Sequence, residues 1–403
     1  MPTINTKWFT SAMAGAPALS GSVGAMISLI DACLKDGFNL LTLDSLVVAS
    51  NVATGTKASH GYLVNQVVLI AGASPSSLNG EWRVASVTSN TFTFAATGIS
   101  DQTATGTITV KTAHCGWEKQ FSGTDSAVYR SGDALSSRIP IRVDDSVGQY
   151  STVLQAESFT DVSTPVNSCG TQYFKKSSTT NATARPWVMV ADGKTFYLGT
   201  DWNSSGNYDF VSAGDFASFV AGDAFPARLQ GLVAPAPAAK GHYSSLSLAS
   251  WEDYSGGTGS AVCPRPYSQV LGSISLFQGS LCAASMPSGA NSVSYAWALS
   301  GNHGYASNQA QQPLSAPSMS DSGYHFVPVF LLERASTNRT LRGTHRGMLH
   351  VMEQLPIASG YQILEGVENV AGGLVLMVAS CGAVWNAGDA YFPSTLAFSL
   401  GGW

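Results

Sequence analysis

Histidines and cysteines are the residues of this 403-residue chain with the widest chemical repertoire. Two of the seven histidines lie close together, in the segment from His345 to His350, five residues apart. Neighbours on a helix face are three or four residues apart and neighbours on a strand face two apart, so this spacing does not predict a shared metal. The six cysteines form no CxxC pair and predict buried free thiols. They are Cys33, Cys115, Cys169, Cys263, Cys282 and Cys381.

Two carboxylates, Asp144 and Asp145, end the run RIPIRVDD. Carboxylates on either side of a glycosidic bond cleave it by acid–base chemistry. Adjacent residues on a strand point to opposite faces, however, so these two do not flank one bond. We expect a solvated strand end here.

An alternation of oxygen-bearing side chains runs from Asp201 to Asn207, with a glycine in the sixth position. This is the order of ligands in an EF-hand calcium loop, and it makes Asp201, Asn203 and Ser205 the candidate metal ligands. The twelfth position holds Ser212 instead of a bidentate glutamate, and the flanks are typical of strand and loop. A polar β-turn is therefore the preferred interpretation.

Four arginines form the densest basic stretch of the chain, within LLERASTNRTLRGTHRGMLHVMEQLP. Such a cluster could bind phosphate or an acidic partner. In a chain with few charges, arginine more often serves a protein interface or an intramolecular network, and Glu333 and Glu353 are near enough to pair. The candidate interface residues here are Arg334, Arg339, Arg342 and Arg346.

Nucleotide-binding and nucleophile motifs are missing from the sequence. It contains no GxxxxGK[ST], no GxGxxG between a strand and a helix, and no GxSxG. We therefore expect no cofactor and no enzymatic activity.

The elements that would position these residues begin with one helix between Ser20 and Gly37. Its apolar residues follow the i, i+3, i+4, i+7 spacing of a helix face, with a serine cap before it and a glycine after it. They are Val23, Met26, Ile27, Ile30, Cys33 and Leu34.

A period of two replaces the helical spacing between about Asp44 and Lys111, in short runs separated by Gly, Asn, Ser or Pro. Five such runs are enough for a small barrel or sandwich. In one predicted hairpin Trp82 and Val84 share a face with Phe92 and Phe94 across the Ser89–Asn90 turn, and Val87 falls out of phase, which indicates a bulge. Trp82 and Phe92 are its candidate contact residues.

Strand-like runs continue to about residue 231. Within this range, Ala191-Asp-Gly-Lys194 predicts a tight hairpin. The stretch VAPAPAAKG, 233 to 241, is typical of a linker. We expect a mainly β protein of several sandwich or barrel domains with one N-terminal amphipathic helix. The predicted units are 1–43 with 113–235 as the body, 44–112 as an inserted module, and 236–403 as a C-terminal domain.

Charge is scarce: 11% of the residues are charged, 44% are hydrophobic, and the formal net charge is −5. The absence of Lys/Arg runs argues against nucleic-acid binding. The longest apolar stretch, Gly373 to Val384, is too short to span a bilayer, and the start of the chain lacks a secretion signal, so we expect synthesis in a cytoplasm. A surface of Ser, Thr, Asn, Ala and Gly predicts extensive protein contacts.

The segment QVVLIAGASPSSLNGEWRVASVTSNTFTF resembles a small β-module of tailed-bacteriophage virion proteins. The opening WFTSAMAGAPALSGSVGAMISLIDACLKDGF and the later TTNATARPWVMVADGKTFYL and LRGTHRGML resemble blocks in structural proteins of long-tailed phages. The resemblance covers most of residues 1–235 and, more faintly, the C-terminal part.

This resemblance implies a virion component made in the bacterial host, acting in the tail or baseplate through contacts with other virion proteins. It also implies a homo-oligomer and a module that projects toward a neighbour or the host surface. Two alternatives stay open. One is a capsid decoration protein; the other is a spike that binds or cleaves host polysaccharide, for which Trp187, Trp202 and Tyr208 beside Asp201 and Asp209 could stack on sugars.

Overall fold

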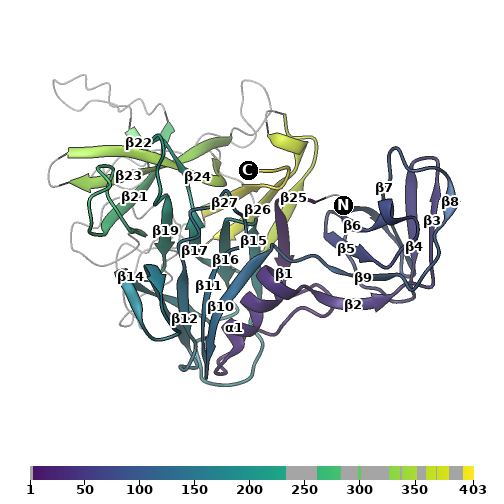
Figure 1. Ribbon diagram of the computed structural model, residues 1–403, viewed down its shortest axis with the longest axis horizontal. Helices are drawn as coiled ribbons and strands as arrows, with labels where there is room; N and C mark the ends of the chain where they lie inside the picture. Colours follow the sequence, from purple (N-terminus) through teal and green to yellow (C-terminus); the bar gives the residue numbers. More distant parts are fainter. Residues whose placement is uncertain are drawn as a thin grey trace.

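The computed structural model describes residues 3–232, 261–282, 298–300, 326–335, 338–351, 360–368, 370–380 and 394–403. Regular structure in these ranges is almost entirely antiparallel β-strand, in sheets of fourteen, five and eight strands (Figure 1). The prediction of a mainly β fold with several sheets and one N-terminal helix is confirmed. None of the described helices combines the length and apolarity needed to cross a bilayer.

The predicted helix forms, but it is shorter than expected. α1 spans Ala25–Ile30 and continues as one π-helical stretch, Asp31–Asp36, before Gly37 ends it at a φ of 73°. Met26, Ile30 and Leu34 are buried, as the stripe predicts, whereas Val23 lies before the helix and is 49% exposed. The N-cap is Gly24, without a side-chain hydrogen bond, instead of a serine.

The eight-stranded sheet, which we call the module, lies to one side of the body (Figure 1) and has its own hydrophobic core. The segment LVVASNVATGT, residues 46–56, forms two strands, because Ser50 and Asn51 both have positive φ and form a two-residue turn. In sheet order its strands are β2 (Phe38–Thr42), β9 (Thr109–Thr112), β5 (Val67–Ala71), β6 (Gly80–Val87), β7 (Thr91–Ala95), β4 (Val52–Thr56), β3 (Ser45–Ala49) and β8 (Gln102–Thr103).

The predicted hairpin β6–β7 forms with its bulge. Val84 pairs with Phe94 and Val87 with Phe92, and the register shifts between Val84 and Ser86. Within the module one aromatic side chain fills the space above a glycine: the ring of Phe92 covers Gly55 on β4, where an added Cβ would lie 2.5 Å from the ring. The module core therefore depends on a residue with no side chain opposite a phenylalanine.

The fourteen-stranded sheet combines strands from both ends of the chain, on either side of the predicted linker 233–241, which itself lies outside the described residues. In sheet order its main strands are β1 (Lys7–Thr10), β15 (Trp187–Ala191), β16 (Thr195–Thr200), β17 (Asp209–Asp215), β19 (Ala227–Gln230), β20 (Ala261–Cys263), β21 (Ile274–Cys282), β23 (Phe326–Ala335), β24 (Asn338–Val351), β27 (Ser394–Ser399), β26 (Val375–Ser380) and β25 (Tyr361–Leu364). Two short strands, β18 (Ala217–Ser218) and β22 (Ala298–Ser300), pair with β24 and β21.

This sheet curls, so strands far apart in its order face each other. The ring of Tyr197 on β16 lies 5.1 Å from that of Phe398 on β27, and the Tyr197 hydroxyl donates to the carbonyl of Arg346 on β24 at 2.8 Å. The outer side of β16 packs on the five-stranded sheet, where Phe196 contacts Trp117 and Phe174. That sheet is formed in order by β10 (Trp117–Gly123), β11 (Ser126–Ser131), β12 (Ile141–Asp144), β13 (Tyr150–Phe159) and β14 (Pro165–Lys175).

Candidate functional site

The outward-pointing residues on four strands of the module carry no charged side chain. Leu46, Val48 and Ala53 point into the module core, so the alternate residues of β8, β3, β4 and β7 point outward. We call this set the outer face. It consists of Thr103, Ser45, Val47, Ala49, Val52, Thr54, Thr56, Thr91, Thr93 and Ala95.

Apolar exposure on the outer face is concentrated at two valines. Val47 is 37% exposed and Val52 is 43% exposed. The hydroxyl of Thr93 forms a hydrogen bond of 2.6 Å with the hydroxyl of Ser86. Charged residues are depleted at the centres of protein interfaces because burying an unpaired charge is costly. A sheet face of threonine, valine and alanine can be covered by another protein without that cost. The alternation in LVVASNVATGT contains this signal, because its outward-pointing positions hold only Val, Ala and Thr.

A group of five residues, which we call the clamp, fixes the module to the body: Lys7, Trp8, Asn65, Glu81 and Arg83. The guanidinium of Arg83 donates to the carbonyls of Asn65, Thr6 and Leu400 at 2.8–3.1 Å. Asn65 belongs to the module, Thr6 directly precedes β1, and Leu400 directly follows β27. Burial lowers the pKa of Arg83, as expected for a guanidinium enclosed by backbone.

The rest of the clamp closes the same junction. Lys7 and Glu81 form an ion pair of 3.0 Å whose side chains are only 4% and 12% exposed. The indole of Trp8 donates to the carbonyl of Asn65 at 3.0 Å, and the Asn65 amide donates to Glu365 at 2.7 Å. The sequence analysis missed all five clamp residues, because their partners lie up to 317 positions apart.

The candidate contact residues of the hairpin differ in placement. Phe92 is fully buried between Tyr62, His60 and Phe94, so the prediction that it offers a contact surface is wrong. The ring is buried because it fills the module core above Gly55. Trp82 is half-buried, stacks on Phe94 at 4.8 Å and donates to the carbonyl of Leu78.

Of the arginine cluster, Arg342 belongs to an intramolecular network instead of a surface. Its side chain is fully buried, with Asp223 at 2.7 Å and Glu333 at 2.9 Å, and its Nη1 donates to Ser218. The two carboxylate contacts are close in distance but not aligned as hydrogen bonds, so they act mainly through charge. Burial raises the pKa of Glu333, despite hydrogen bonding to Tyr267 and the charge of Arg342.

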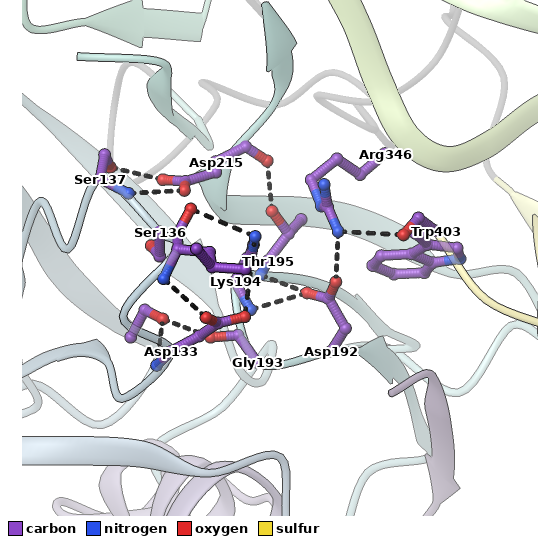
Figure 2. A network of polar contacts seen from close by, with 12 residues as sticks. Asp133, Ser136, Ser137, Asp192, Gly193, Lys194, Thr195, Asp215, Arg346 and Trp403 are labelled. Atoms are coloured by element: carbon purple, nitrogen blue, oxygen red, sulfur yellow. Dashed lines mark hydrogen bonds and ion pairs between the residues drawn. The ribbon is translucent and has the colours of Figure 1, made fainter. Parts of the chain in front are cut away.

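Arg346 is also paired within the chain, in the network of Figure 2. It donates to Asp192 at 2.9 Å and to the carbonyl of Trp403 at 3.3 Å. The other Asp192 oxygen accepts from the amides of Lys194 and Thr195, which closes the predicted hairpin between β15 and β16. Arg334 and Arg339 face each other in the register of β23 and β24. Their side chains and Glu353 lie outside what the structure describes.

Around this hairpin, polar contacts join the loop after β11 and the end of β17 (Figure 2). Lys194 reaches the carbonyl of Leu135 and Asp133 in the loop after β11. Asp215, at the end of β17, accepts from the amide and hydroxyl of Ser137. Burial raises the pKa of Asp215, although these bonds oppose the shift. The network joins β15, β16, β17 and the loop after β11 within the body.

In the candidate calcium loop, the carboxylate oxygens of Asp201 accept hydrogen bonds from backbone amides of the same loop. The two carboxylate oxygens of Asp201 accept from the amides of Ser205 and Gly206, both at 2.8 Å, and Asp201 is 2% exposed. Amide hydrogens occupy the oxygens that a cation would need, so the polar turn preferred from the sequence fits this geometry. Within the described residues, no three His, Cys, Asp or Glu side chains gather around a point that could hold a metal ion.

The aromatic residues considered for sugar stacking are mostly enclosed. Trp187 is fully buried and Tyr208 is 6% exposed, so neither ring offers a face. Trp202 is half-buried, and the ammonium of Lys175 lies 3.4 Å from its ring centroid. Three rings in this region therefore do not form a sugar platform.

Asp144 and Asp145 point to opposite faces, as predicted, but Asp145 is not solvated. It is fully buried, pairs with the equally buried Lys176, and accepts from the hydroxyl of Ser151 at 2.6 Å. Its other oxygen accepts from the amides of Met26 and Ile27 at 2.8 and 3.3 Å. The first turn of α1 thus obtains its missing cap from a strand end 119 positions away.

The structure describes the side chains of four cysteines, and all four are buried free thiols, as predicted: Cys33, Cys115, Cys169 and Cys263. Burial raises the pKa of three of them, Cys115, Cys169 and Cys263, to about 12. A thiolate nucleophile needs the opposite shift, so these groups are inert.

Comparison with known proteins adds little to this geometry. No family model and no curated protein matches the chain. Among solved structures, phage phi92 endosialidase aligns at 12% sequence identity with a TM-score of 0.17, over 89% of this chain and 51% of that chain. The chain thus spans about half the length of that protein, and an alignment with this score supports neither a fold nor a function.

Proposed function

We propose that this protein is a structural component of a tailed-phage virion, placed in the tail or baseplate, and that the module binds a neighbouring protein through its outer face. In this proposal the protein acts through assembly contacts and not through catalysis. The observation that carries the proposal is an uncharged, exposed sheet face on a module that the clamp holds in one orientation.

Four features support it. The sequence resembles phage virion proteins over most of residues 1–235, and the chain has half the usual proportion of charged residues. In the described part, the arginine and carboxylate clusters that could serve catalysis or ligand binding pair with each other. A clamped module loses little orientational freedom when it binds, so its binding energy is not spent on ordering the junction.

The test places charge on the outer face. We expect Val47→Glu with Val52→Glu to fold normally, because both side chains are exposed, and to lower incorporation of the protein into particles, or host adsorption, at least tenfold, equivalent to about 1.4 kcal/mol. Quantitative mass spectrometry of purified particles measures incorporation. The matched control is Leu135→Glu, at a body residue that is 85% exposed. Wild-type incorporation and adsorption by the double variant would exclude the outer face as the contact.

The same measurement addresses position in the particle. A copy number near a small multiple of three or six, relative to the portal, fits a tail or baseplate ring. Hundreds of copies would instead identify a capsid decoration protein. Absence from particles would contradict the virion proposal and favour the alternative of a polysaccharide-cleaving protein.

A further inference from the structure

A buried guanidinium without a counter-charge lies inside the curled sheet. Arg228, on β19, is fully buried. Its Nη1 makes one long contact, 3.5 Å, to the carbonyl of Gly214, and its guanidinium carbon lies 5.0 Å from the ring centroid of Tyr197. Nε and Nη2 have no hydrogen-bond partner in the described part of the chain.

Among the described residues, the surroundings of Arg228 supply donors but no carboxylate that lacks other partners. Strand register places Tyr197 opposite Ser212 and Arg228 opposite Gly214, two residues further along β17, so Tyr197, Ser212 and Arg228 share one face. His345 approaches this face from β24, with its Nδ1 3.5 Å from the Tyr197 hydroxyl. The Ser212 hydroxyl and His345 Nε2 are buried and, among the described residues, unpartnered.

The carboxylate whose charge acts on Arg228 has other partners. Burial lowers the pKa of Arg228; Tyr197 and, to a smaller extent, the charge of Asp215 oppose this shift, but both oxygens of Asp215 bind Ser137. Burial and the charge of Arg228 hold the pKa of His345 well below its usual value, so the imidazole is neutral near pH 7 and does not add a second charge.

An arginine in a protein stays protonated, and an isolated buried charge is strongly unfavourable. Buried charges are accordingly paired. We propose that a small inorganic anion of the halide class binds beside Arg228, accepting hydrogen bonds from its Nε and Nη2 and from Ser212 or His345. The site would fix β16, β17, β19 and β24 together inside the curl. It is independent of the outer face and of the proposed function.

The test uses the full-length wild-type protein with chloride, bromide or gluconate at equal ionic strength. Thermal unfolding is expected to shift upward by about 1–3 °C for each tenfold rise in halide concentration above the Kd, and not with gluconate. Crystals grown in bromide should show an anomalous peak in contact with the Arg228 guanidinium. Arg228→Met should abolish the halide response, whereas Arg130→Met, at an exposed arginine on β11, should retain it.

Two outcomes would overturn the proposal: a wild-type protein whose unfolding ignores halide and whose bromide crystals show no peak at Arg228, or a full halide response in Arg228→Met. If Arg228→Met does not fold, the wild-type bromide map decides alone. Failure here leaves the virion proposal intact, since that rests on particle incorporation.

Discussion

At the scale of single residues, the charges of this protein act mostly on each other. Asp145 shows the pattern: one carboxylate binds a buried lysine, a serine and two amides of α1. Such a group contributes to stability only as part of the set, because removing one member leaves the others buried and unpaired.

Asp145→Asn should therefore destabilise the fold by about 3–5 kcal/mol, since it leaves the ammonium of Lys176 buried without a counter-charge. Urea unfolding followed by tryptophan fluorescence measures the loss. The neighbouring Asp144→Asn is the control. Asp144 is half-buried and accepts only from Ser146, so we expect a change of less than about 1 kcal/mol. Similar losses in both variants would contradict the assigned role of Asp145.

Glu157 provides a pH-dependent contribution. Hydrogen bonding to Arg265 lowers its pKa in the folded state, with a smaller contribution from Asn167. A lowered folded pKa stabilises the protein above the unfolded value, about 4.3, and that contribution is lost as the pH falls through the folded pKa. We expect wild type to exceed Glu157→Gln by up to about 1 kcal/mol at pH 6 and by nothing near pH 2.5, in denaturant titrations across this range. A gap independent of pH would show that the charge of Glu157 is not responsible.

At the scale of elements, close packing between strands decides which residues are free to serve function. Phe92 lies in an alternating strand sequence, and this pattern alone does not decide whether its ring points into the core or toward solvent. Its ring occupies the volume above Gly55, and Phe210 does the same above Gly199 in the large sheet. These pairs make both aromatic residues part of the packing.

Gly55→Ala should consequently destabilise the protein by about 1–3 kcal/mol, because its Cβ would lie 2.5 Å from the ring of Phe92. Thermal and urea unfolding of the purified variant measure this cost. Gly193→Ala is the matched control: its added Cβ finds its nearest neighbour at 3.5 Å, so the expected change is within about 0.5 kcal/mol. If Gly55→Ala were as stable as the control, Phe92 would have room to move out of the core.

At the scale of the whole molecule, the module and body form one unit through the clamp. Three backbone carbonyls from distant segments meet at the guanidinium of Arg83, and the Lys7–Glu81 pair lies beside them. The outer face is thereby presented in a constant orientation, as the proposed assembly role requires.

Replacing Arg83 with Met should loosen this junction. We expect a loss of about 1.5–3 kcal/mol in the free energy of unfolding and faster amide exchange in β1 and β6, because three carbonyls lose a charged donor. Hydrogen–deuterium exchange with mass spectrometry localises the effect. Arg130→Met, which removes an exposed pair with Glu118, should leave the exchange of both strands unchanged. Unchanged exchange in Arg83→Met would mean that the clamp does not hold the module.

What the sequence alone determined is local. The stripe of Met26, Ile30 and Leu34 predicts the helix, the period of two predicts the strands and the Val87 bulge, and Ala191-Asp-Gly-Lys194 predicts its hairpin, because each pattern reports a repeat within a few residues. Charge depletion likewise indicates a surface suited to contact with other proteins.

Only the tertiary structure decided which side chains remain available to a partner. From the sequence, Asp145, Phe92 and Arg342 could each be exposed or buried. In the structure each is buried through contacts with residues far along the chain; Arg342, for example, pairs with Asp223. The outer face and the clamp depend in the same way on strand order and register. Periodicity tells which residues share a face but not what covers it, because the covering segment is chosen by long-range packing that no local pattern contains.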